Sequence, residues 1–322
     1  MGMKRVIIAG AIFTLTNISF AKADIEVVTS IKPVHSLVSG VMAGVGVPSL
    51  IIDGAGSPHT YSLKPSQAKQ LQDAKLVFWM GDELETFLAG PIENIAQSAT
   101  TIKLTDAHDL KKIKFREGGM FDDHGHDDHD EHDHEKHDEH DHEKHDEHDH
   151  EKHDEHDHEK HAKTEHDDHD GHDDHGHGEF DPHVWLDPVN AKALVHEIEE
   201  ALVRADPKHA STYEANAHKM MEKLDTLTAE LREELEPVHE NGFIVFHDAY
   251  QYFEQRFDLA AIGSITVSPE VMPGAERVSE LREKILELNA TCVFSEPQFE
   301  PKLVETLVEG CLLYTSPSPR DS

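Results

Sequence analysis

The chain has 322 residues, of which 37% are hydrophobic, and a formal net charge of −36 at pH 7 with histidine counted as neutral. This length suffices for one large domain or two smaller ones. The strong acidity excludes nucleic acid and an anionic membrane surface as the main partner and favours the binding of cations.

The first 23 residues have the pattern of a secretory signal peptide. Lys4 and Arg5 precede an apolar run over 6–15, and residues 21–23 form a small-x-small cleavage pattern before Asp24. The run is too short to span a bilayer, and no later segment of the sequence approaches 18 apolar residues. We therefore expect an exported mature protein without membrane insertion.

In the body of the chain, short β-rich runs alternate with amphipathic stretches, which is the pattern of α/β layering. A glycine-rich turn at 53–57 follows the second of these runs and leads to His59. Proline is tolerated in the first turn of a helix, and two prolines mark helix starts here. The sequence predicts strands over 25–29, 49–52 and 76–80, a helix from about Pro33 and a helix over 65–73.

Residues 122–178 differ in composition from the rest of the chain. They contain 20 of the 29 histidines and 26 acidic residues against 5 lysines, and Ala162 is their single apolar side chain. Because such a segment has almost nothing to bury, we expect a disordered insert. The octapeptide HDEHDHEK occurs four times in tandem over 129–160. This density of imidazoles predicts several weak metal sites, with His172, His175 and His177 as auxiliary ligands.

Beyond the insert, Asp187 and Pro188 predict an N-cap followed by a proline in the first turn of a helix, and Asp206 and Pro207 repeat the pattern. The second of these helices meets no breaker until Pro237 and would be roughly 43 Å long. We therefore expect a rigid strut between two lobes. The second lobe is predicted to contain strands over 243–246, 260–265 and 291–294 and helices over 248–256, 273–288 and 302–309.

These signals predict a division of the chain into segments. They are a signal peptide at 1–23, an N-terminal lobe at 24–206 with the insert 122–178, a linking helix at 207–237, and a C-terminal lobe at 238–310. Residues 311–322 have no helical or strand period, and we expect a non-native tail that truncates the second lobe. Cys311 is then foreign, and no bridge to Cys292 is expected.

Nine histidines lie outside the insert, and three of them stand out by context. His59 follows a strand and a glycine-rich turn, His183 precedes a capped helix, and His247 ends the strand FIVF. Because ligands of open α/β sheets bind beyond the carboxyl ends of strands, these imidazoles can converge in one cleft. Three imidazoles with water or a carboxylate give the tetrahedral geometry that zinc prefers. The others are expected on the surface: His35, His108, His196, His209, His218 and His239.

Several segments, taken in order, resemble the ZnuA family, the periplasmic zinc-binding components of bacterial ABC-type zinc importers. They are PHTYSLKPSQAKQLQDAKLVFWMG, the histidine-rich insert, DPHVWLDP, VFHDAYQYFE and ATCVFSEPQFEP. The resemblance implies two α/β lobes joined by a long rigid helix, with Zn2+ in the cleft between them and His59, His183 and His247 as its ligands. It also implies a periplasmic location and delivery of the ion to an ABC transporter permease in the inner membrane. We expect a monomer.

The chain departs from the family pattern in two places. Pro58 stands where some members have a glutamate that completes the zinc shell, so the resemblance implies water or another carboxylate as fourth ligand. The family also continues beyond Gly310 with residues that line the cleft, among them a cysteine that partners the position of Cys292.

Three other functions are weighed against zinc capture. A manganese or iron importer of the same superfamily would carry a carboxylate in place of His247, because oxygen ligands suit harder ions. A passive metal buffer would rely on the insert alone. A metallohydrolase needs an open coordination position beside a general base. No HExxH pairing occurs in the sequence, so we do not expect an enzyme.

Overall fold

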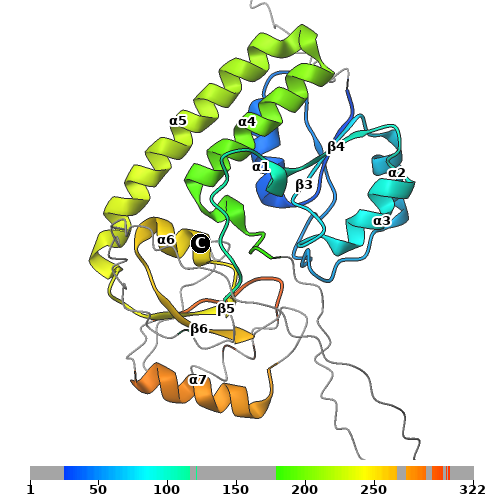
Figure 1. The fold of residues 1–322 in the computed structure, drawn as a ribbon. Coiled ribbons are helices and arrows are strands. Elements are labelled where there is room, and N and C mark those ends of the chain that lie inside the picture. Colours follow the sequence, from blue (N-terminus) through cyan, green and yellow to red (C-terminus); the bar gives the residue numbers. More distant parts are fainter. Residues whose placement is uncertain are drawn as a thin grey trace, which may run out of the picture. The chain divides into compact units, whose positions relative to one another are not determined.

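The computed structural model describes residues 25–116, 121, 179–266, 273–287, 292–299, 302 and 304. The signal peptide expected at 1–23, the histidine-rich insert and the tail expected at 311–322 lie outside these residues. The same holds for the auxiliary ligands expected at His172, His175 and His177. The described residues form two lobes, each built on a parallel sheet with helices, so the α/β class expected from the sequence is confirmed (Figure 1).

The N-terminal lobe contains a four-stranded parallel sheet in the order β2-β1-β3-β4. Its strands are β1 (Val27–Thr29), β2 (Ser49–Leu50), β3 (Leu76–Trp79) and β4 (Thr100–Lys103). All of β3 is buried, as expected of an apolar strand in a parallel sheet that helices cover on both faces.

Two helices of this lobe begin where the sequence predicts. α1 (Lys32–Val41) has Pro33 in its first turn, and α2 (Pro65–Asp73) begins at Pro65. The side chain of Gln67 in α2 donates to the carbonyl of Ile51, 2.6 Å away, and to the hydroxyl of Tyr61, 2.9 Å away. α2 therefore holds both ends of the loop that carries His59.

Two elements, α3 (Thr86–Asn94) and β4, were not expected from the sequence. α3 contains Gly90 and Pro91, which usually interrupt a helix. The first two residues of β4 are exposed threonines, so the strand lacks the buried apolar run that marks β3. Both elements depend on their neighbours more than on their own local pattern.

The start of α4 (Pro188–Ala205) confirms the expected N-cap, because the carboxylate of Asp187 accepts from the N–H of Val189 at 2.8 Å. The second expected N-cap, Asp206, does precede a proline in the first turn, but it does not begin α5 directly and its side chain makes no cap hydrogen bond. A 3-10 turn (Pro207–His209) intervenes, and the carboxylate of Asp206 accepts from Nδ1 of His209 at 2.6 Å and from the hydroxyl of Tyr213 at 3.0 Å. Burial alone would raise the pKa of Asp206, but these two hydrogen bonds lower it below its usual value.

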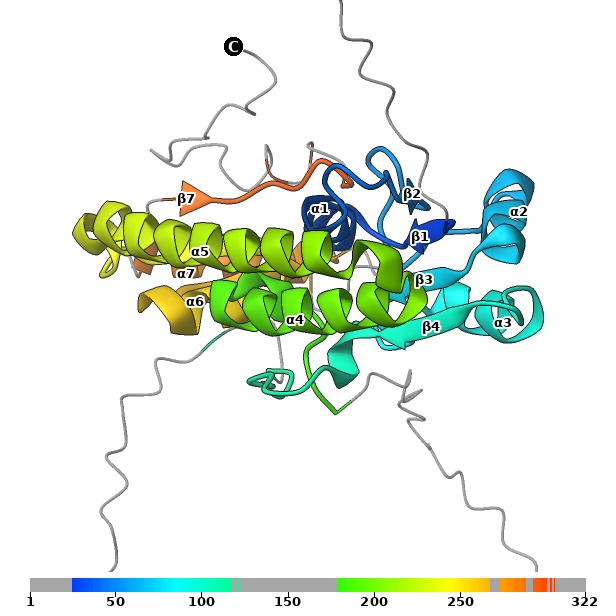
Figure 2. The same cartoon turned by 90° about the horizontal axis from the view of Figure 1, so that it is seen from above.

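The long helix α5 (Ala210–Leu235) has 26 residues, which corresponds to roughly 39 Å. Figures 1 and 2 show it running alongside α4, and it contacts α1 as well. Tyr213 and Ala217, in its first half, are buried in the core of the N-terminal lobe. Near its other end α5 contacts α6 (Gln251–Phe257) of the C-terminal lobe.

The C-terminal lobe contains a three-stranded parallel sheet in the order β6-β5-β7, formed by β5 (Phe243–His247), β6 (Ala261–Thr266) and β7 (Cys292–Val293). The helix α7 (Ala275–Glu287) packs against β6. α6 begins three residues later than the sequence predicts, because residues 248–250 form a bend in which Asp248 binds Arg116. Of the helix expected over 302–309, only Lys302 and Val304 belong to the described residues, and both are helical.

Each lobe has an apolar core. The core of the N-terminal lobe includes Tyr252 of α6, a residue of the other lobe, and this side chain is almost fully buried. Within the described ranges, none of the helices is both long enough and apolar enough to cross a membrane.

Candidate metal centre

Three imidazoles from three separate segments come together between the lobes. One ligand-capable atom from each of His59, His183 and His247 lies within 4.8 Å of the other two. The ring centroids are 5.4 to 5.7 Å apart. Zn–N bonds of about 2.0–2.1 Å in tetrahedral geometry place two nitrogens about 3.4 Å apart. Small side-chain movements would therefore close this cluster on an ion.

Each histidine is placed by the end of a secondary-structure element. His247 is the last residue of β5, and His183 directly precedes the 3-10 turn (Val184–Leu186) that leads into α4. His59 lies in the loop after β2, where Gly54 adopts a φ of +103° that most side chains disfavour. The sequence predicted these three positions, and the structure brings the three side chains together.

His183 and His247 are nearly buried, whereas His59 is half-buried. The six other described histidines are exposed or half-buried, as expected. His209 binds Asp206, and His239 binds the carbonyl of Glu236. The hydrogen bond to Glu236 raises the pKa of His239 above its usual value.

Two carboxylates that sequence reasoning did not single out lie directly behind the cluster. Nδ1 of His183 is 2.6 Å from Oδ1 of Asp181, and Nδ1 of His247 is 2.7 Å from Oε1 of Glu296. Both carboxylates are buried. A local signal was present for Asp181, which is two residues before His183, but Glu296 is 49 residues from His247.

Aromatic rings line the cluster on two sides. The ring of Trp185 is 5.3 Å from that of His183, and the ring of Phe299 is 5.7 Å from that of His247. Phe299 also stacks on Phe246 of β5, with centroids 4.1 Å apart. Such an apolar shell limits solvent access and strengthens electrostatic interactions with a bound ion.

The residue after His247 belongs to a charged cluster. Arg116 donates to the carboxylates of Asp248 and Glu254, and its guanidinium carbon lies 3.7 Å from the ring centroid of Phe121. Burial alone would lower the pKa of Arg116, but the hydrogen bonds to Glu254 and Asp248 raise it. Arg116 is therefore always charged, and it fixes the bend that follows β5.

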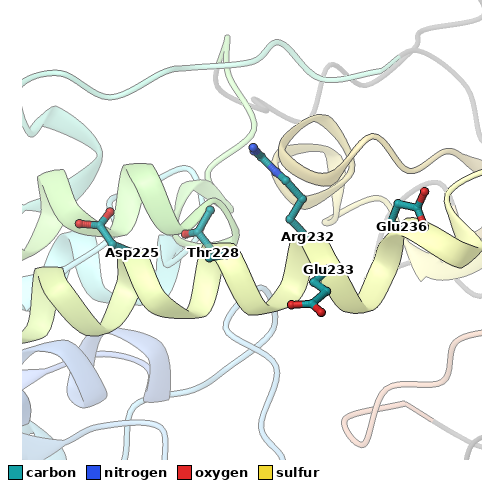
Figure 3. Close-up of a pocket in the computed structure, with 6 residues that line it drawn as sticks. Asp225, Thr228, Arg232, Glu233 and Glu236 are labelled. Carbon is teal, nitrogen blue, oxygen red and sulfur yellow. The ribbon is translucent and has the colours of Figure 1, made fainter.

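A hollow on the side of α5 is separate from the histidine cluster. Figure 3 shows that Arg232 and Glu233 extend to opposite sides of this one helix, so its polar groups do not converge on a point. None of the lining residues is a histidine, and we find no arrangement here that suits a metal ion. The hollow is lined by Asp225, Thr228, Ala229, Arg232, Glu233 and Glu236.

The structure has two α/β lobes, each with a parallel sheet, together with a long helix and three imidazoles that converge between the lobes. This arrangement defines a two-lobed solute-binding protein with a candidate metal centre. The family model for ZnuA, described as zinc-uptake complex component A, periplasmic, matches residues 27–317, and the chain belongs to this family.

The relatives of this chain include proteins named high-affinity zinc uptake system protein ZnuA. The protein from Brucella abortus (strain 2308) is 57% identical over 284 residues, which cover 88% of this chain and 80% of the relative. The protein from Yersinia pestis is 32% identical over 319 residues, which cover 96% and 86%. These names describe a component of an uptake system, not an enzyme.

Among solved structures, a crystal structure of ZnuA matches with a TM-score of 0.66 at 22% identity and covers 90% of this chain and 89% of that one. At this level of identity the similarity supports the fold alone. The two-lobed architecture expected from the sequence agrees with it.

Proposed function

We propose that this chain captures Zn2+ in the periplasm and delivers it to an ABC-type permease in the inner membrane, with His59, His183 and His247 as zinc ligands. The convergence of these three imidazoles from two lobes is the observation that carries the proposal. The family description, a periplasmic component of a zinc-uptake complex, supports the same ion and compartment.

The donor set favours zinc over harder ions. Neutral imidazole nitrogens suit zinc, whereas manganese and magnesium prefer carboxylate and water oxygens. Within the part of the chain that the structure describes, the ligand group contains no fourth side chain. Water or a carboxylate from elsewhere completes the tetrahedral shell.

The ligand assignment is tested by zinc titration of the mature full-length chain against a competing chelator. His59→Ala, His183→Ala and His247→Ala should each weaken the tight site by more than the about 10- to 100-fold that loss of an outer-shell partner costs, because each removes a ligand of the ion itself. The matched control is His218→Ala, an exposed histidine of α5 that pairs with Glu222. Tight binding that is unchanged in all three ligand variants would contradict the assignment.

Deletion of residues 122–178 separates zinc capture from passive buffering. An importer component keeps one tight site after the deletion, whereas a buffer loses it. A manganese or iron site is tested by competition: the wild-type chain should prefer Zn2+, and His247→Asp should shift the preference toward Mn2+ because it adds oxygen ligands.

The processing and assembly of the chain are part of the proposal. The mature chain begins at Asp24 after removal of residues 1–23, and it is a monomer with an N-terminal lobe at 24–206, a linking helix at 207–237 and a C-terminal lobe at 238–310. Mass spectrometry of the periplasmic protein tests the cleavage site. Light scattering with and without zinc tests the monomer.

A further inference from the structure

We propose that Asp181 and Glu296 are positioning residues of the metal centre. They hold His183 and His247 in the tautomer that presents Nε2 to the ion, and they supply two negative charges that three neutral imidazoles lack. This inference rests on the proposed zinc site and deepens it.

The first pair is Asp181 and His183. Oδ1 of Asp181 is 2.6 Å from Nδ1 of His183 and also accepts from the backbone N–H of His183 at 2.9 Å. The Asp181 side chain is fully buried. An ionised carboxylate has acceptors only. The proton of the neutral imidazole is therefore on Nδ1, and Nε2 carries the lone pair for a metal.

The second pair is Glu296 and His247. Oε1 of Glu296 is 2.7 Å from Nδ1 of His247, and its other oxygen accepts from the side-chain amide of Gln298 at 2.5 Å. The nearby Phe299 packs its ring against that of His247. One short segment after β7 therefore holds the His247 ring both at its nitrogen and at its side.

Asp181 is in turn held by α6 of the other lobe. The amide of Gln251 donates to Oδ2 of Asp181 at 3.3 Å, and the hydroxyl of Tyr252 donates to the carbonyl of Asp181 at 2.7 Å. Burial raises the pKa of Tyr252 to about 12, so this hydroxyl remains a donor. Gln251 is four residues after His247. The segment that bears one histidine thus fixes the carboxylate that orients another.

The charge of the site supports the same roles. A divalent cation among three neutral imidazoles in a largely buried site would lack compensation, and Coulomb interactions are strong where water is excluded. Asp181 and Glu296 together carry two negative charges, one behind each of two rings. A carboxylate that accepts a hydrogen bond from Nδ1–H also raises the basicity of the imidazole toward the metal.

The test uses the mature full-length chain and two readouts. The first is 15N NMR of histidine-labelled apo protein, which reports the tautomer of each ring without any metal. Wild-type His183 and His247 should both carry the proton on Nδ1. In Asp181→Ala and Glu296→Ala the ring behind the lost carboxylate should shift toward the other tautomer. This readout does not depend on zinc binding.

The second readout is zinc affinity of Asp181→Asn and Glu296→Gln, which keep an acceptor and the shape of the side chain but remove the charge. Each should weaken binding about 10- to 100-fold. The matched control is Asp206→Asn, because Asp206 is also buried and binds Nδ1 of His209 at 2.6 Å. It is not part of the histidine cluster and should leave zinc affinity unchanged.

The outcomes separate this inference from the proposed function. If the histidine-to-alanine variants lose tight binding but Asp181→Asn and Glu296→Gln bind as Asp206→Asn does, the positioning role is wrong and the zinc site stands. Unchanged tautomers in Asp181→Ala and Glu296→Ala overturn the orienting role. If Asp181→Ala does not fold, the two isosteric variants and Glu296→Ala still decide the question. Tight binding that survives loss of the histidines overturns the zinc site itself.

Discussion

The guanidinium of Arg256 binds the carboxylate of Asp187 through two hydrogen bonds, from Nε to Oδ1 at 2.7 Å and from Nη2 to Oδ2 at 2.6 Å. Asp187 also accepts from the N–H of Val189 and so begins α4. The buried carboxylate of Asp187 therefore caps a helix of the N-terminal lobe and also binds α6 of the C-terminal lobe. Asp187 lies only four residues after His183.

Removal of Arg256 from this pair should destabilise the protein. Arg256→Ala leaves Asp187, which is 2% exposed, with an uncompensated charge, and the free energy of unfolding should fall by about 1–3 kcal/mol. Arg256→Lys should restore part of the loss, since an ammonium replaces the charge but not the two-pronged hydrogen bond. Urea denaturation checks both values.

A matched control is Arg204→Ala in α4, whose partner Glu200 is four residues away on the same helix. This pair is exposed, and exposed ion pairs contribute little to stability. An equal loss in Arg204→Ala and Arg256→Ala would contradict the special role of the contact between Asp187 and Arg256.

Much of the fold could be predicted because its signals are local. Pro65 starts α2, Asp187 caps α4, and the apolar run of β3 marks a buried strand. Asp206 begins a 3-10 turn and does not cap α5 with its side chain, because its carboxylate binds His209 and Tyr213 instead of the backbone. These hydrogen-bond partners lie three and seven residues after Asp206, so the Asp-Pro dipeptide alone does not reveal them.

The site was partly predictable for the same reason. The context of each of the three histidines, at the end of a strand or before a helix cap, is visible in the sequence. Glu296 was missed because its pairing depends on strand register. Ile244 of β5 lies opposite Val293 of β7. His247 and Glu296 each lie three residues further along the chain, and this pairing brings them side by side. Register between distant parallel strands is a tertiary property.

A second prediction concerns Glu85, which is fully buried. Burial raises its pKa from 4.5 to about 7, although its Oε2 accepts from the N–H groups of Met80 and Gly81. Between pH 4.5 and 7 the folded state holds a proton that the unfolded state has released. Stability should therefore fall across this window as pH rises, by up to about 3 kcal/mol.

Glu85→Gln tests this dependence, because glutamine is neutral at every pH and retains a carbonyl acceptor. The two proteins should have similar stability near pH 4.5, and the variant should be the more stable above pH 7. Chemical denaturation at a series of pH values gives the difference in free energy of unfolding. A difference that does not change with pH would show that Glu85 does not titrate in this range.

A third prediction concerns Gly81, which has a φ of +136°. A Cβ there would lie 2.5 Å from Cε of Lys103 and 3.0 Å from Oγ1 of Thr105. Backbone strain alone would lower the free energy of unfolding by about 1–3 kcal/mol. Gly81→Ala should lower it further, because the added Cβ also meets these side chains. Gly44→Ala is the control, because Gly44 also has a positive φ, +82°, but a Cβ meets nothing within 4 Å. Equal losses in thermal unfolding would mean that the close contacts at Gly81 relax without cost.

The last prediction uses Trp185, whose ring contacts that of His183. The chain has two tryptophans, and the other, Trp79 of β3, is buried in the core of the N-terminal lobe. An ion bound at Nε2 of His183 places positive charge beside the Trp185 indole, so zinc should change the emission of Trp185. Trp79→Phe should keep this response, and Trp185→Phe should lose it while retaining most of the zinc affinity, because Trp185 is not one of the ligand groups. His183→Ala should remove both the response and the affinity. A response that persists in Trp185→Phe and disappears in Trp79→Phe would place the bound ion away from His183.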